Sequence, residues 1–175
     1  MSTQLSRPGA GEYAPFYAGY VADMPDGDLV AALERQGEET FALLSALPEE
    51  RGEHRYAPGK WTIKDIAGHL ADAERVFAYR ALRFARGDTA PLAGFDENEY
   101  VRTAGAGRRP LVDLARELHA VRGATLAFLR GLPPGTAERR GSANGVEISV
   151  RALAWVIAGH ERHHIRVLHE RYLTG

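Results

Sequence analysis

Apolar residues recur every three or four positions in four stretches of the chain, each about 20 residues long. Such spacing buries one face of an α-helix and leaves the opposite face in water. The first stretch runs from Asp28 to Leu47, and Pro48 ends it. Its inward-facing positions are Leu29, Leu33, Gln36, Thr40, Leu44 and Leu47.

Residues that start or stop helices bound the other three stretches. Thr62 can cap a helix N-terminus with Asp65 three positions later, and the periodic pattern then continues to Gly87. A third helix is expected over 110–131 and a fourth over 149–173. Because no long strand pattern accompanies them, the four helices predict an all-α four-helix bundle.

Three of the segments outside the expected helices carry a pattern of their own. Residues 1–27 are rich in Gly, Pro and Tyr without periodicity, which indicates an extended N-terminal arm and leaves 28–175 as the helical domain. Residues 87–110 form a long glycine-rich connection, a candidate lid. We expect it to cover a pocket at one end of the bundle, walled by the second and fourth helices. Asn144 and Gly145 lie between two short alternating runs and predict a small β-hairpin before the last helix.

Composition restricts the class of protein. The 175 residues, 45% hydrophobic and 26% charged, suit a single domain, and no apolar run approaches the length of a membrane span. The net charge of −1, with scattered basic residues, gives no electrostatic footprint for nucleic acid. Residues 1–11 lack the charged and apolar regions of an export signal, so a cytoplasmic location is expected.

The chain contains no cysteine. Disulfides, thiolate metal ligands and an internal thiol nucleophile are therefore excluded, and His, Asp and Glu remain as the plausible metal ligands. Any thiol chemistry would need a thiol supplied from solution.

Helical phase separates the seven histidines. At about 100° per residue, His160 and His164 lie about 40° apart within the apolar stripe of the fourth helix. His69 shares a face of the second helix with Ile66 and Phe77, so it should also look into the bundle. The other four lie at a stripe margin, toward solvent or in a loop: His163, His119, His169 and His54.

Imidazoles one helical turn apart can bind the same ion, since their Cβ atoms are only about 5–6 Å apart. A third imidazole from a facing helix would complete a site with positions left for water or substrate, as in catalytic metal sites. Three neutral ligands leave the ion its full charge, which favours the deprotonated form of a bound water or thiol. A histidine pair satisfied by hydrogen bonds is the alternative.

The segment from His160 to His164 also matches the H-E-x-x-H pattern of zinc proteases. In that interpretation Glu161 would be the general base. A protease would still need a third ligand and a strand to align its substrate, and no sheet is expected here. We therefore expect Glu161 to border the core or to pair with an arginine.

The sequence around these histidines resembles the DinB superfamily and, within it, the YfiT-like branch. The resemblance rests on segments 61–72 and 158–164 and extends from about residue 28 to 173. Known members include transferases and isomerases that use bacillithiol, mycothiol or glutathione, and others named as metal-dependent hydrolases. The resemblance implies a four-helix bundle with one divalent metal, often zinc or nickel, held by His69, His160 and His164.

Three functions follow as hypotheses, the first two being enzymes with a small-molecule substrate. In the first, the metal activates bacillithiol or mycothiol for transfer to a small electrophile. In the second, a metal-dependent hydrolase, metal-bound hydroxide attacks an ester or amide while the long loop with Asp96, Glu97 and Glu99 helps to exclude bulk water. The third is a non-enzymatic metal-binding stress protein. No catalytic residue beyond the metal ligands and no organic cofactor site is predicted, and a homodimer is expected only by analogy.

Overall fold

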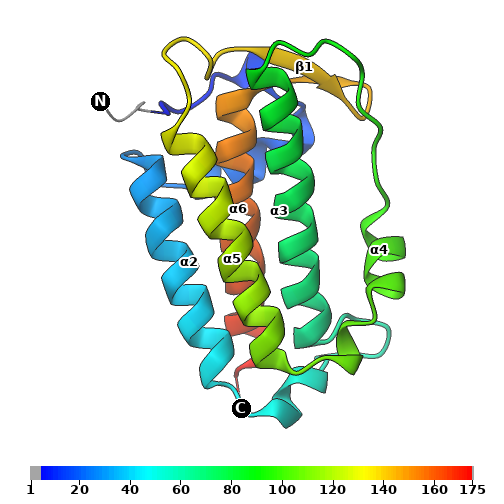
Figure 1. Cartoon of the computed structure of the whole chain (residues 1–175). Coiled ribbons are helices and arrows are strands. Elements are labelled where there is room, and N and C mark those ends of the chain that lie inside the picture. Colours follow the sequence, from blue (N-terminus) through cyan, green and yellow to red (C-terminus); the bar gives the residue numbers. More distant parts are fainter. Residues whose placement is uncertain (1–4, 175) are drawn as a thin grey trace.

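Four long helices lie side by side along the molecule (Figure 1). The computed structural model describes residues 5–174. Around the bundle each helix contacts the next in the order α2, α5, α3, α6, and α6 closes the ring against α2. The predicted four-helix bundle is confirmed, and the helices are α2 (Leu29–Ala46), α3 (Ile63–Ala85), α5 (Leu111–Arg130) and α6 (Val150–Val167).

The expected cap residues begin these helices. The Asp28 carboxylate accepts hydrogen bonds from the first backbone N–H groups of α2. Thr62 and Asp65 form both hydrogen bonds of a capping box at the start of α3. Ser149 caps α6, which continues through a five-residue π-helix, η5 (Leu168–Tyr172). Within 5–174, none of the helices is both long and apolar enough to span a bilayer.

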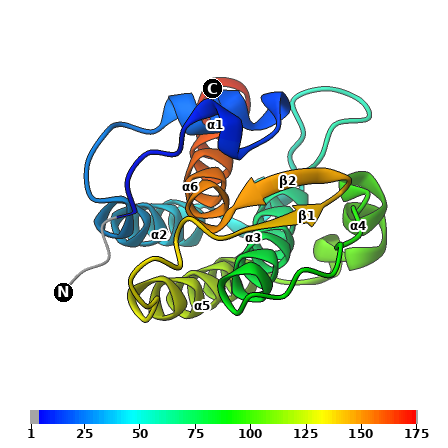
Figure 2. The same cartoon turned by 90° about the horizontal axis from the view of Figure 1, so that it is seen from above.

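The predicted hairpin crosses one end of the bundle (Figure 2). Strands β1 (Arg140–Ala143) and β2 (Val146–Ser149) pair antiparallel around Asn144 and Gly145, which both have positive φ. Leu92 adds a short parallel bridge to β1, since its N–H donates to the Ser142 carbonyl and its carbonyl accepts from Asn144. The hairpin thereby holds the start of the connection between α3 and α5.

That connection is not the irregular loop expected over 87–110. It contains α4 (Glu97–Ala104) and a short 3₁₀ helix, η4 (Ala106–Arg108). Asp96 caps the N-terminus of α4, and the helix ends at Gly105, whose φ is 66°. No residue of α4 is buried, so the helix carries no apolar stripe that periodicity could reveal.

The N-terminal segment is also not extended, contrary to expectation. It forms η1 (Ala10–Glu12), η2 (Pro15–Tyr17) and α1 (Ala18–Asp23), and α1 packs against α6. Gly159 permits this approach, because a Cβ there would lie 2.5 Å from the carbonyl carbon of Tyr20. Consequently α6 is covered on all sides over 152–161, and the segment forms part of the core. A short turn, η3 (Glu49–Glu53), joins α2 to α3.

A polar layer separates two apolar clusters within the bundle. On α6, one cluster ends at Ala158 and the other begins near Leu168, and His160, Glu161 and His164 lie between them. On α5, Arg122 occupies the corresponding gap between Leu118 and Leu126. These three polar side chains of α6 and the buried Arg122 of α5 therefore lie at one level of the bundle.

Candidate metal centre

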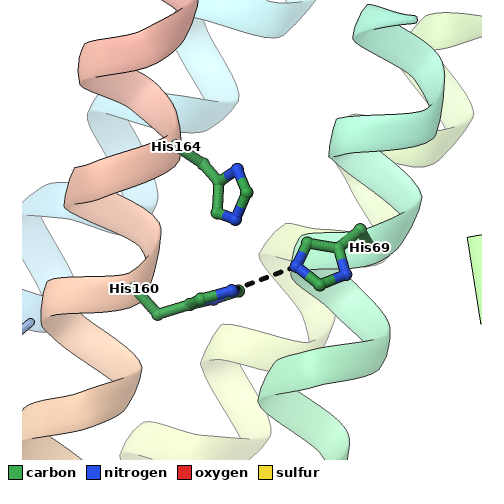
Figure 3. A group of neighbouring side chains, drawn as sticks. All are labelled: His69, His160 and His164. Carbon is green, nitrogen blue, oxygen red and sulfur yellow. Dashed lines mark hydrogen bonds between the residues drawn. The ribbon is translucent and has the colours of Figure 1, made fainter. Parts of the chain in front are cut away.

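Three imidazoles from two neighbouring helices converge at the polar layer (Figure 3). His69 comes from α3, and His160 and His164 come from successive turns of α6. The ring centroid of His69 is 4.9 Å from those of both His160 and His164, which are 4.6 Å from each other. One nitrogen from each ring lies within 4.8 Å of the others. The structure thus brings together the three residues selected by helical phase.

This spacing fits a single divalent transition metal. Ligand nitrogens bound tetrahedrally to zinc at about 2.0–2.1 Å lie roughly 3.3 Å from one another. Nε2 of His69 is already 3.0 Å from Nε2 of His160, joined to it by a hydrogen bond. The His164 nitrogen lies within 4.8 Å of the ligand nitrogens of the other two residues. Histidine nitrogens suit zinc, nickel, copper and iron, so the donor set alone does not select the metal.

Burial keeps all three imidazoles neutral at pH 7. It lowers the pKa of His69 to about 4, with the Glu97 charge acting in the opposite direction. It lowers the pKa of His164 to about 3 and that of His160 well below its usual value. Coordination requires neutral imidazole, so the folded protein offers its ligands in the form that binds metal.

The remaining histidines are excluded from the cluster by their positions. His169 is exposed, as helical phase predicts, and His119 pairs with Glu38 on the surface. His54 stacks edge-on against Tyr172 away from the three rings. His163 is closer than expected, since it lies 5.2 Å from the His164 ring and lines the adjoining pocket without joining the ligand set.

A pocket of about 440 Å³ opens beside the three histidines. Along α3 it extends from His69 to Arg80, so it runs along the flank of the bundle rather than at one end. Phe95 and Glu97 of the 87–110 connection form part of its wall, as expected. Asn144 of the hairpin also lines it. The pocket is walled by more of the chain than α3 and α6 alone.

The N-terminal segment supplies an aromatic wall that was not expected from sequence. Phe16, Tyr17 and Tyr20 line the pocket, and the Tyr20 ring lies 5.5 Å from the ring of His160. These aromatics, with Tyr13, recur three and four residues apart, which is a weak helical signal. The segment was too short and glycine-rich for that signal to stand out.

Of the three acidic residues expected near the site, only Glu97 faces the pocket. Asp96 caps α4, and Glu99 pairs with Arg102 on the surface. The structure records no cation paired with Glu97 among the residues it describes. This leaves a carboxylate without a counter-ion on the pocket wall that the histidines share.

The protease interpretation of the 160–164 segment is wrong. The Glu161 carboxylate lies in the bundle interior and accepts from Arg122 at 2.7 Å. Arg122 also makes a two-pronged ion pair with Glu74. Glu161 is absent from the pocket wall, so it cannot serve there as a general base. Its role is the alternative expected from sequence, pairing with an arginine.

Comparison with known proteins identifies relatives across most of the chain. The model of the DinB superfamily matches residues 32–168. A protein of Geobacillus thermodenitrificans (strain NG80-2), named "Putative metal-dependent hydrolase", is 31% identical over 100 residues, 55% of this chain and 56% of that relative. The match thus spans little more than half of that relative's length. A protein of the same description from Geobacillus kaustophilus (strain HTA426) is 25% identical over 137 residues, 77% of each chain.

Two solved structures share the fold. YfiT from Bacillus subtilis, described as a probable metal-dependent hydrolase with an unusual four-helix bundle topology, superposes with a TM-score of 0.75 at 20% identity, covering 96% of this chain and 95% of that one. A mycothiol-dependent maleylpyruvate isomerase gives a TM-score of 0.64 at 18% identity over 82% of this chain and 60% of the other. At such identities the likeness concerns the architecture alone.

Proposed function

The chain belongs to the DinB superfamily, and from this premise we propose that it is a metal-dependent hydrolase of a small ester or amide. In this proposal His69, His160 and His164 hold one divalent ion, zinc or nickel. The observation that carries it is the convergence of three neutral imidazoles on the wall of an open pocket that also holds a free carboxylate. Two relatives named as hydrolases support the same reaction class.

A bound divalent ion would supply a Lewis acid that lowers the pKa of a water or thiol beside the pocket. Side chains of the chain itself would hold the ion, border the substrate and accept a proton. The three histidines bring no negative charge, so they do not weaken that effect. Tyr20 and Trp61 border the histidines and present aromatic surface to the same pocket.

Glu97 is positioned to act as general base. It lies at the start of α4 on the pocket wall, and its charge is felt at both His69 and Tyr20. During hydrolysis the water oxygen bonds to the substrate's carbonyl carbon while Glu97 takes a proton from that water. The bond to the leaving oxygen or nitrogen then breaks as the leaving group receives a proton.

Thiol transfer is the second candidate. The pocket of about 440 Å³ has room for a small nucleophile beside an electrophile, and a chain without cysteine must take its thiol from solution. Bacillithiol or mycothiol would then be the cosubstrate, and Glu97 would accept the thiol proton.

Turnover distinguishes these functions. Metal-loaded and chelated protein are compared on a panel of esters and amides, and separately with bacillithiol or mycothiol and chlorodinitrobenzene. Glu97→Gln should lower the metal-dependent rate about a hundredfold or more while keeping one metal per chain. The matched control is Glu99→Gln, on the same helix but outside the pocket, which should leave the rate unchanged. Metal-dependent turnover only with thiol would reassign the protein as a transferase, and turnover with neither would favour the non-enzymatic hypothesis.

Metal content after gel filtration tests the ligand set. Alanine at position 69, 160 or 164 should remove most of the bound metal, because one of three protein ligands is lost. His163→Ala and His169→Ala should each retain about one ion per chain. Metal loss in His163→Ala with retention in His160→Ala would contradict the assignment.

A further inference from the structure

Arg80 differs from every other buried charged residue in the described chain. Six Lys, Arg, Asp or Glu residues are buried there, and five of them have a partner of opposite charge: Glu12, Lys64, Glu74, Arg122 and Glu161. Arg80 is only 3% exposed, yet no acidic side chain within 5–174 forms an ion pair with it. Burying a charge without a partner is costly, so such a residue calls for an explanation.

The neighbours of Arg80 leave part of its guanidinium available. One terminal nitrogen donates to the Ala93 carbonyl at 3.0 Å. The guanidinium also lies near enough to the Tyr17 hydroxyl to act on the pKa of that group. A guanidinium has five N–H donors in a planar fork, so the hydrogen bond to Ala93 does not exhaust it. The remaining contacts are with aromatic faces, the rings of Phe77 and Phe95. Arg80 also lines the pocket that holds the three histidines.

Tyr17 adds a donor beside the guanidinium. Burial raises the pKa of its hydroxyl, with Arg80 acting in the opposite direction, so the group keeps its proton at neutral pH. Within residues 5–174 this hydroxyl donates to no other side chain or carbonyl, so its O–H can donate to a ligand in the pocket that Tyr17 lines. An anion in the pocket could therefore receive hydrogen bonds from both residues.

Phe77 connects this end of the pocket to the histidines. Its ring centroid is 6.0 Å from the Arg80 guanidinium carbon and 5.8 Å from the His160 ring. A single small molecule lying along Phe77 would therefore reach both groups. The wall between them is aromatic, which favours an apolar or aryl body over a strongly polar one.

We propose that Arg80 and Tyr17 bind the carboxylate of a small substrate whose apolar body lies along Phe77 and whose reactive carbon reaches the three histidines. This assignment of the substrate class rests on the function proposed above. Arginine pairs with carboxylates in a bidentate geometry. The free carboxylate of Glu97 in the same pocket disfavours ligands with two or more negative charges, such as phosphate monoesters.

A matched pair of ligands tests the anion site without requiring turnover. Dissociation constants of 3-phenylpropanoate and its neutral amide, 3-phenylpropanamide, are measured by calorimetry on chelated and on metal-loaded protein. Wild type should prefer the carboxylate about tenfold or more in both forms, the range of a charge-assisted hydrogen bond. Arg80→Met should abolish the preference while leaving amide affinity and metal content unchanged. Arg83→Met, one turn away on the surface of α3, should retain it.

The outcomes separate this inference from the proposed function. Equal affinity for the two ligands in wild type, or an unchanged carboxylate preference in Arg80→Met, would overturn the anion site. If circular dichroism shows that Arg80→Met does not fold, the two ligands are compared on wild type and on Arg80→Lys instead. Lysine keeps the positive charge but lacks the planar N–H donors of the guanidinium, so Arg80→Lys should weaken the carboxylate preference. A carboxylate preference in wild type, lost in Arg80→Met, together with no turnover of any ester or amide by metal-loaded wild type, would uphold the anion site and reject the hydrolase. Equal turnover of neutral and anionic esters, with rates unchanged in Arg80→Met, would uphold the hydrolase and reject the anion site.

Discussion

Gly159 allows α1 to cross α6, and replacing it with alanine should loosen that contact. The added Cβ would lie 2.5 Å from the carbonyl carbon and 2.8 Å from the Cα of Tyr20. Both are backbone atoms, so no rotation of a flexible side chain can relieve the clash. Instead α1 must move away from α6, and it would carry Tyr17 and Tyr20 from the pocket wall.

The expected magnitude combines two opposing effects. Within a helix, Gly→Ala usually stabilises a protein by about 0.5–1 kcal/mol, since alanine restricts the unfolded chain. Overpacking a tight contact costs about 1–3 kcal/mol. For Gly159→Ala we therefore expect a net loss of about 1–2 kcal/mol in the free energy of unfolding. Metal content should not change, because His160 and His164 stay on an intact helix.

Gly123→Ala is the matched control, because Gly123 lies within α5 and a Cβ there would meet nothing within 4 Å. Urea unfolding followed by circular dichroism should show Gly123→Ala to be more stable than wild type by about 0.5–1 kcal/mol. Gly159→Ala should be less stable than wild type. Equal stabilisation by both substitutions would show that α1 does not pack on α6 in solution.

Three further predictions concern stability and motion. Arg122→Leu should cost about 3–5 kcal/mol in urea unfolding because it leaves two buried carboxylates without their cation, whereas exposed Arg116→Ala should cost under about 0.5 kcal/mol. Arg151 lowers the pKa of Glu12 to about 2, so the stability contributed by that pair is complete above the unfolded-state pKa of 4.5 and is lost as pH falls toward 2. Between pH 4.5 and pH 2 the free energy of unfolding should therefore fall by on the order of 3 kcal/mol more in wild type than in Glu12→Gln. Parallel plots of unfolding free energy against pH for the two proteins would refute this linkage. Protease cleavage within 87–110 should slow when metal and 3-phenylpropanoate bind, and equal cutting rates would identify the segment as a fixed connector.

Helical periodicity and cap residues predict the four long helices closely. Asp28, Thr62 and Ser149 start α2, α3 and α6 where expected, because the cap bonds are local and the apolar stripes are long. The same phase argument brings His69, His160 and His164 together. Their service as metal ligands remains a prediction, tested by the variants above.

The features missed from sequence depend on contacts between distant segments. The helix pattern leaves Arg80 ambiguous between a solvated and a structural residue, and its burial becomes visible only when the connection around Ala93 is seen to lie against α3. The close approach at Gly159 likewise requires knowing that α1 folds back across the chain. Short elements such as α4 have too few apolar residues for any period to emerge.

The polar layer also determines how far each helix can slip along its neighbours. A slide of α5 by one turn, about 5.4 Å, would draw Arg122 from between Glu74 and Glu161 and place its charge among leucines. An apolar core alone tolerates such a shift, because one leucine layer resembles the next. The ion pairs therefore fix the axial register of the helices. By aligning α3 with α6 they keep His69 level with His160 and His164.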